Sequence, residues 1–166
     1  MKILKEALKY APNVSFEADI LNNIGVFLLI NNNIEECIEY FKMSLIKDSS
    51  LMLAYHNLVL AHLLKSEINL AKLEIDKLEN LSQGVDKGYK YRNLGVYYYL
   101  TGDIENAKNN FEKGILETTQ YEILLIDFYY AKFLYETGYP LKAKEYFEKS
   151  LKQNIFEAKK WLQTYE

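Results

Sequence analysis

One pattern occurs four times along this chain of 166 residues. Leu94 to Gly114 (LGVYYYLTGDIENAKNNFEKG) aligns without gaps on Ile24 to Ser44 (IGVFLLINNNIEECIEYFKMS). Tyr129 to Ser150 follows the same frame, and Leu58 to Leu78 follows it more loosely. Self-similarity at a period of this length is typical of proteins that stack one short structural unit, so it constrains the fold more than any local feature does.

Two marker positions, mostly small residues, recur at identical intervals of 34, 36 and 36 residues. The first marker falls at Gly25, Val59, Gly95 and Ala131, and the second at Cys37, Ala71, Ala107 and Ala143. A polar turn separates the two markers in each copy, so each copy predicts a pair of helices joined by a short turn. Small residues let antiparallel helices approach closely, and we expect Gly25 to face Cys37 and Gly95 to face Ala107.

The turns also predict where the second helices begin. Asn33 and Glu36 have the spacing of a capping box, and Asp103 can accept from the free backbone donors of its helix. Pro140 follows the fourth turn, where its fixed φ and missing N–H suit the first residue of a helix.

This pattern resembles the tetratricopeptide repeat family over roughly residues 17–153. The residues that carry the resemblance best are Leu94, Gly95, Tyr98, Gly102, Ala107 and Phe111. Val59 and Ile75 depart from it, because the family has a small residue and an aromatic at those positions. The resemblance implies an all-α fold, a right-handed superhelical array of antiparallel helix pairs (an α-solenoid) with capping helices.

We expect a single domain made of caps and repeats. The predicted segments are an N-terminal cap at 1–13, repeats at about 17–49, 51–82, 88–119 and 123–153, and a C-terminal capping helix at 155–165. Repeat stacks need caps to cover a bare apolar face, and Trp161 is predicted to pack on the fourth hairpin. The segment from Ser82 to Gly88, with two glycines, is the loosest joint and a candidate hinge.

Composition narrows the classes of function. The formal net charge is −3, which gives no electrostatic reason to expect nucleic acid as a partner. Apolar runs are broken well before the length of a membrane span, and the N-terminus lacks the uninterrupted apolar core of a signal peptide. With one cysteine no intrachain disulfide can form, so we expect a soluble, cytoplasmic protein.

The sequence contains none of the catalytic or cofactor-binding patterns that were considered: a metal-binding pair of histidines, a reactive cysteine or a phosphate-binding loop. His56 and His62 are six residues apart and fall on different faces of a helix, which disfavours metal binding. Cys37 occupies a small-residue packing position, so it is interpreted as structural rather than reactive. No glycine-rich phosphate loop occurs. We therefore expect no enzyme activity, no metal and no cofactor.

The candidate binding residues follow from the expected architecture, in which the first helix of each pair lines a concave groove. The predicted groove residues are Asn22, Val26, His56, Leu60, Arg92, Val96, Tyr99, Phe128, Lys132 and Tyr135. Members of the family that hold the acidic C-terminus of heat-shock chaperones use polar groups on this stripe, whereas Val26, Leu60 and Val96 are apolar. The stripe thus favours an apolar or aromatic guest, with Arg92 and Lys132 for a carboxylate or carbonyl.

Three functions stay open. The favoured hypothesis is a scaffold whose groove binds a peptide or helix of another protein. The first alternative is a chaperone for an exported protein or the ligand-sensing half of a regulator. The second is self-association into a homo-oligomer through the apolar stripe and the caps.

Overall fold

The computed structural model describes residues 1–78, 85–118, 122–153, 155 and 157–165. Within these residues the chain is helical and contains no strand, which confirms the all-α prediction. The chain divides into two compact units, Met1–Ser82 and Gln83–Glu166. The boundary falls inside the glycine-containing segment 82–88 that the sequence marks as a candidate hinge.

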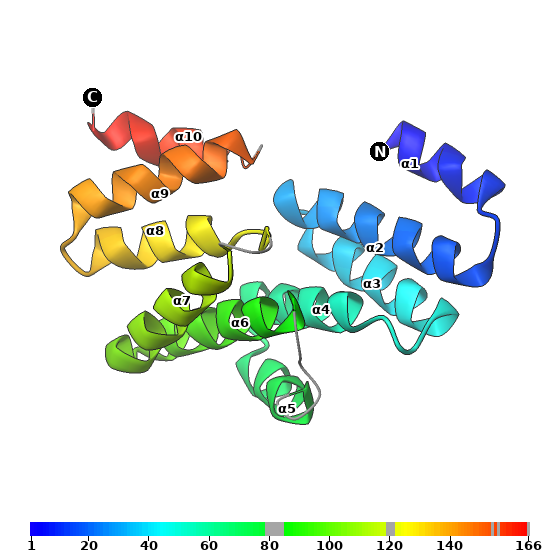
Figure 1. Ribbon diagram of the computed structural model, residues 1–166, viewed down its shortest axis with the longest axis horizontal. Coiled ribbons are helices and arrows are strands. Elements are labelled where there is room, and N and C mark those ends of the chain that lie inside the picture. Colours follow the sequence, from blue (N-terminus) through cyan, green and yellow to red (C-terminus); the bar gives the residue numbers. More distant parts are fainter. Residues whose placement is uncertain (79–84, 119–121, 154, 156, 166) are drawn as a thin grey trace. The chain divides into compact units, whose positions relative to one another are not determined.

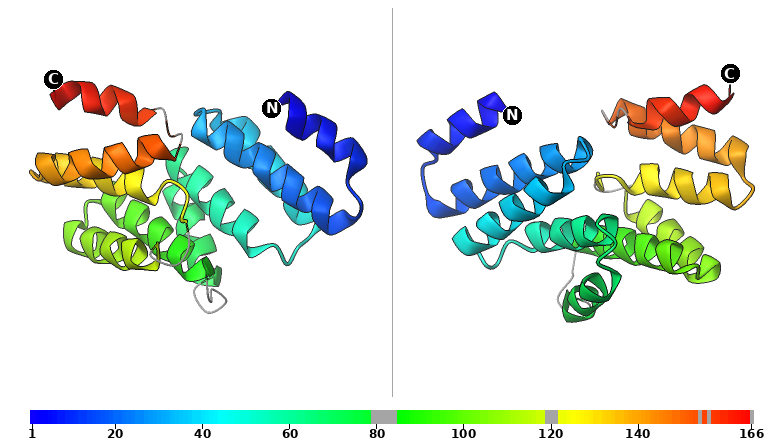
Figure 2. Two further views of the ribbon diagram at one scale, coloured as in Figure 1. Left: turned by 45° about the horizontal axis from the view of Figure 1, so that its top comes forward. Right: turned by 180° about the vertical axis from the view of Figure 1, so that it is seen from behind.

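The first unit contains two helical hairpins preceded by a short helix (Figure 1). Its elements are α1 (Lys2–Ala7), the 3₁₀ turn η1 (Leu8–Tyr10), α2 (Val14–Ile30), α3 (Ile34–Lys47), α4 (Met52–Leu64) and α5 (Ile68–Leu78). The second unit repeats this plan and ends in a short helix (Figure 2). Its elements are α6 (Val85–Thr101), α7 (Ile104–Glu117), α8 (Ile126–Glu136), α9 (Pro140–Lys152), α10 (Glu157–Leu162) and the 3₁₀ turn η2 (Gln163–Tyr165).

The four hairpin turns share one backbone motif. Each turn has one residue in the left-handed region, with φ between 59° and 89°, at Asn32, Ser66, Gly102 and Gly138. The next residue donates its N–H to a carbonyl five positions back, as in Asn33 to Leu28 at 2.9 Å, and the same bond recurs at the other three turns. This bond satisfies a carbonyl that the end of the first helix leaves free. The spacing of the motif repeats the 34, 36, 36 intervals of the sequence.

The predicted helix starts have mixed outcomes. Oδ1 of Asp103 accepts from the backbone N–H of Asn106 at 3.1 Å, and Pro140 is the first residue of α9, as expected. The capping box at Asn33 is wrong: among the described residues its side chain makes no capping bond. Asn33 instead begins α3 through its carbonyl, which accepts from the N–H of Cys37 at 3.0 Å.

The glycines of the first helices make room for an aromatic ring rather than for another small residue. A Cβ added to Gly25 would lie 2.5 Å from Cε1 of Phe41, and one added to Gly95 would lie 2.7 Å from Cδ1 of Phe111. The closest neighbour of each glycine is therefore an aromatic ring, rather than Cys37 or Ala107. The aromatic one turn further along the second helix makes the closest contact, because a flat ring can lie directly on a helix that has no side chain there.

The second hairpin lacks this arrangement. Val59 and Ile75 stand where the first and third hairpins have glycine and phenylalanine. The branched side chain of Val59 fills the space that an aromatic ring would need, so α5 cannot lie flat on α4. In Figure 1, α4 is seen from the side while α5 is strongly foreshortened, which shows that the two helices cross.

The predicted packing of Trp161 on the fourth hairpin is confirmed. The indole ring of Trp161 on α10 stacks on Phe147 of α9, with ring centroids 5.3 Å apart and an interplanar angle of 15°. Tyr165 adds a hydrogen bond from its hydroxyl to the carbonyl of Pro140 at 2.8 Å.

The candidate hinge at 82–88 is only partly described. Residues 82–84 lie outside the described part of the chain. Val85–Gly88 form the first turn of α6, and Gly88 is packed so closely against Ile123 that an added Cβ would lie 2.5 Å from Cδ1 of that residue. These last four residues are therefore helix rather than hinge.

We predict that Gly95→Val destabilises the second unit by about 1–3 kcal/mol, because the new side chain overlaps the fully buried ring of Phe111. Urea unfolding followed by the fluorescence of Trp161, the only tryptophan, measures this free energy in the unit that contains the change. Asn109→Val on the exposed face of α7 is the control and should cost about 0.5 kcal/mol or less. Equal losses for the two variants would contradict the packing argument.

We also predict that Cys37 is protected from alkylation in the folded protein. Burial and the nearby carboxylate of Glu35 raise the pKa of this thiol to about 12, so its reactive thiolate is scarce at about pH 8. Iodoacetamide should label the protein in urea and leave the native protein unlabelled, as mass spectrometry would show. Because the folded pKa lies above the unfolded one, this group stabilises the fold below about pH 9 and loses that contribution as the pH rises further.

Candidate functional site

The ten predicted groove residues divide into buried and half-buried side chains. Those with at most 2% of their surface exposed are Asn22, His56, Leu60, Arg92, Val96 and Phe128. The half-buried ones are Val26, Tyr99, Lys132 and Tyr135. A guest cannot touch a side chain that the folded chain itself covers, so the binding prediction is carried forward with the second group alone.

The buried polar members of the stripe are engaged inside the chain. Nδ2 of Asn57 on α4 donates to Oδ1 of Asn22 on α2 at 3.1 Å. A buried amide needs such a partner, since an unsatisfied one costs about 1–3 kcal/mol. The pair therefore links the first helices of consecutive hairpins.

Arg92 has the same kind of role in the second unit. Its Nη1 donates to the carbonyl of Leu124 at 3.1 Å, and its Nε and Nη2 donate to Oδ1 of Asn93, each at 3.0 Å. The guanidinium carbon lies 4.8 Å from the ring centroid of Tyr89, a cation–π contact. Burial lowers the pKa of Arg92 to about 10, which still leaves it charged at neutral pH. Arg92 thus ties α6 to the segment before α8, and a guest does not reach it in this structure.

Tyr99 and Lys132 form the accessible part of the stripe in the second unit. The ring of Tyr99 lies edge-on to Phe133, with centroids 6.1 Å apart. Burial and a hydrogen bond with Glu136 raise the pKa of the Tyr99 hydroxyl, so it remains a neutral donor. Nζ of Lys132 lies within 5.9 Å of three ring centroids, those of Phe128, Tyr129 and Trp161. The arrangement offers an aromatic surface beside a cation.

Tyr135 is shared with the C-terminal elements of the chain. Its ring meets Trp161 edge-on at 5.3 Å and Tyr165 at 6.0 Å between centroids. These elements therefore cover part of the stripe in the fourth hairpin. Tyr99 and Lys132 are the residues through which a guest would make its first contacts.

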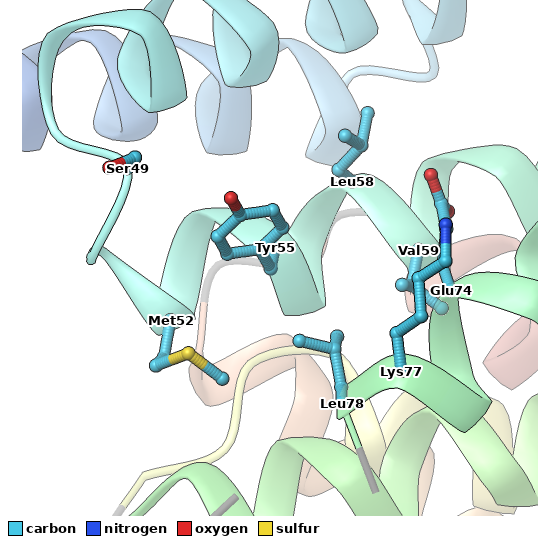
Figure 3. A pocket seen from close by; sticks show the side chains of 8 residues that line it. All are labelled: Ser49, Met52, Tyr55, Leu58, Val59, Glu74, Lys77 and Leu78. Atoms are coloured by element: carbon cyan, nitrogen blue, oxygen red, sulfur yellow. The ribbon is translucent and has the colours of Figure 1, made fainter. Parts of the chain in front are cut away.

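A second surface, which the sequence analysis did not find, is a groove along α4 in the first unit. It consists of two adjoining cavities of about 380 and 480 Å³ that share Leu58 and Glu74. Figure 3 shows the side chains of the first cavity. They are Ser49, Met52, Tyr55, Leu58, Val59, Glu74, Lys77 and Leu78. The second cavity is lined by Glu35, Ile38, Glu39, Lys42, Leu58, His62, Lys65, Glu67, Leu70 and Glu74. We call the two together the α4 groove.

The sequence does carry a signal for the α4 groove. Val59 and Ile75 are the two departures from the repeat pattern, and both lie in the hairpin whose second helix crosses α4 instead of lying flat on it. A cavity is more easily formed in a hairpin that lacks the close helix contact of the other repeats.

The histidines are accounted for by packing and hydrogen bonding. The ring N–H at Nδ1 of His62 donates to Oε2 of Glu74 at 2.8 Å, and His56 is buried. In the described part of the chain, no group of three or more His, Cys, Asp or Glu side chains is placed to hold a metal ion.

We predict that Arg92→Ala lowers the free energy of unfolding of the second unit by about 2–5 kcal/mol. The change leaves the carbonyl of Leu124 and the amide of Asn93 without their donor and opens a cavity. Urea unfolding followed by Trp161 fluorescence measures the loss. Lys87→Ala, which removes an exposed cation from the same helix, should cost at most about 0.5 kcal/mol. A stable Arg92→Ala protein would return Arg92 to the list of candidate binding residues.

Comparison with known proteins finds a repeat family that matches part of this chain. Residues 91–117 match the family model of the tetratricopeptide repeat. Over 96 residues the chain is 30% identical to a protein named NADPH oxidase activator from Dictyostelium discoideum, a match that covers 57% of this chain and 16% of that protein. Within the described residues, none of the helices is both long enough and apolar enough for a membrane span.

The matched residues lie in α6 and α7, which form the hairpin with the closest fit to the repeat pattern. The other hairpins share its turn motif and its spacing. The chain is therefore a helical-hairpin repeat protein whose third hairpin matches the tetratricopeptide repeat and whose other hairpins are similar to it in spacing and turn geometry.

Proposed function

We propose that this chain is a non-catalytic module that binds a segment of another protein. The observation that carries the proposal is the half-buried aromatic and cationic surface of Tyr99, Lys132 and Tyr135 on the first helices of tetratricopeptide-type hairpins. Tyrosine side chains contribute large contact areas at a low cost in ordering, which is why they are common at the centres of protein interfaces.

The proposed mechanism is capture by a preformed surface. An apolar or aromatic side chain of the guest packs against the ring of Tyr99. A guest carboxylate or backbone carbonyl accepts a hydrogen bond from the ammonium group of Lys132. The neighbouring rings hold this ammonium group in place without neutralising it. Because Tyr99 and Lys132 are already ordered by contacts within the second unit, binding loses less conformational entropy than it would on a flexible surface.

The relative from Dictyostelium discoideum agrees with a binding role. Its name describes an activator of NADPH oxidase, a protein that acts on another protein. The shared 96 residues are a small part of that protein, so we propose only that the common segment serves protein interaction. We also propose a cytoplasmic location, which the single, buried Cys37 supports.

The two other hypotheses give different results in solution. Self-association through the stripe predicts a sedimentation coefficient that rises with protein concentration. A chaperone for an exported protein predicts binding to an unfolded client and release when the client folds. A partner segment that binds a monomer of this chain favours the scaffold.

We predict that a photo-reactive phenylalanine analogue at position 99 cross-links the partner, and that the purified partner segment binds Lys132→Glu about tenfold more weakly than the wild type. Reversing the charge replaces an attraction for a guest carboxylate by a repulsion, and tenfold corresponds to about 1.4 kcal/mol. Lys108→Glu, on the exposed face of α7, makes the same charge change away from the stripe and should alter affinity less than about twofold. Equal affinities for both variants would exclude Lys132 from the interface.

A further inference from the structure

The α4 groove is not used by the binding surface proposed above, which lies entirely in the second unit. Its floor is one face of α4, formed by Met52, Tyr55, Leu58, Val59 and His62. These positions follow the i, i+3, i+4, i+7 spacing with which one helix packs against another. On the wall formed by α5, the side chain of Leu70 is 43% exposed.

The groove has a physical origin in the second hairpin. In the first and third hairpins an aromatic of the second helix lies directly on a glycine of the first. Val59 and Ile75 do not provide that contact, and α5 crosses α4 (Figure 1). In the groove beside α4, Met52 and Tyr55 are half-buried, whereas Leu58 and Val59 are buried (Figure 3). The partly exposed apolar side chains of the groove are those of Met52, Tyr55 and Leu70, and a group of this kind is typical of a place where a partner packs.

The charges along the groove are not evenly distributed. The second cavity, at the C-terminal end of α4, is lined by four glutamates and two lysines. Glu67 pairs with Lys65 at 2.8 Å and Glu74 accepts from His62 at 2.8 Å. The pair of Glu39 with Lys42 is longer, at 3.5 Å, and exposed to solvent, so Glu35 and Glu39 form the acidic surplus. The field of this surplus is felt by Lys65, whose pKa is raised by Glu67 and, to a smaller degree, by Glu35 and Glu39. At the opposite end the lining carries Lys77.

We propose that the α4 groove binds an amphipathic helix of another protein that carries lysine or arginine beside its apolar face. The apolar face of the guest packs on Met52, Tyr55 and Leu70, while its basic residues lie next to Glu35 and Glu39. The guest helix runs antiparallel to α4. In that direction its positive N-terminus meets the acidic end and its negative C-terminus meets Lys77, which is the favourable alignment of a helix dipole. The geometry corresponds to the helix-in-groove mode of recognition.

A synthetic peptide of about 18 residues tests the proposal directly. The probe has leucines on one face of the helix and lysines on the flanks. Its controls are a version with glutamates on the flanks and a scrambled version of equal composition. Fluorescence anisotropy measures the affinity of each peptide. The lysine peptide should bind at least about tenfold more tightly than either control. Equal binding of the scrambled peptide would mean that only net charge is recognised, and would overturn the proposal.

Methionine methyl NMR locates the peptide. The chain has three methionines, of which Met52 lines the groove, and Met43 lies on the outer side of α3 with 45% of its surface exposed. The Met52 signal should shift on binding while the Met43 signal stays in place. A spin label at the peptide C-terminus should broaden Met52 more than a label at its N-terminus. The reverse broadening would overturn the proposed direction, and an unmoved Met52 signal would overturn the site.

Variants on α3 separate specific recognition from general attraction. The double change Glu35→Lys with Glu39→Lys should lower the affinity for the lysine peptide at least about tenfold and raise the affinity for the glutamate peptide. The matched control is Glu36→Lys, which is exposed on the same helix but does not line the groove, and it should change affinity less than about twofold. Full affinity in the double variant would overturn the proposal.

Two further readouts decide between occupants and between proposals. If the peptide-free protein dimerises and the double variant is a monomer by sedimentation, the groove is filled by a second copy, and the proposed partner is wrong. Lys132→Glu should leave peptide affinity unchanged. If Lys132→Glu loses peptide binding, the α4 groove is not a separate site and this proposal is overturned. If Lys132→Glu keeps peptide binding and loses only the partner that cross-links at position 99, the result concerns the proposed function alone.

Discussion

The contact between an aromatic ring and the bare backbone of a glycine is the interaction on which the first and third hairpins depend. Gly25 receives the ring of Phe41, and Gly95 receives the ring of Phe111. A ring seated in this way sets the distance between the two helices and buries both partners almost completely. The left-handed turn residue at each hairpin then reverses the chain within a few residues, and together the two features explain why the pattern repeats every 34 to 36 residues.

The same contact explains where binding surfaces arise. In the third and fourth hairpins, close packing of the helix pairs leaves the side chains of Tyr99 and Lys132 half-buried on the first helices. In the second hairpin the contact is missing, and this is the hairpin that contains the α4 groove. The surface of Tyr99 and Lys132 therefore lies on closely packed hairpins, whereas the α4 groove lies in the hairpin that lacks the contact between glycine and an aromatic ring.

Polar residues on the first helices show how this repeat protein provides hydrogen-bond partners for its buried polar groups. The expectation from sequence treats Asn22 and Arg92 as binding groups, because they lie on the stripe of the first helices that is expected to face a groove. Here the side chain of each is bonded within its own unit, to Asn57 for the first and to Asn93 and the carbonyl of Leu124 for the second. A buried donor must be matched, and the chain supplies the match itself.

The sequence alone determined the helix class, the four hairpins, the start of α7 at Asp103 and the packing of Trp161, since periodicity, turn residues and caps are local properties of the chain. The tertiary structure decided which stripe residues are exposed, that Asn33 does not cap through its side chain, and that a groove lies along α4. Exposure and cavity shape depend on how closely neighbouring helices pack. That distance is set by pairs such as Val59 and Ile75, whose effect appears only when both helices are in place.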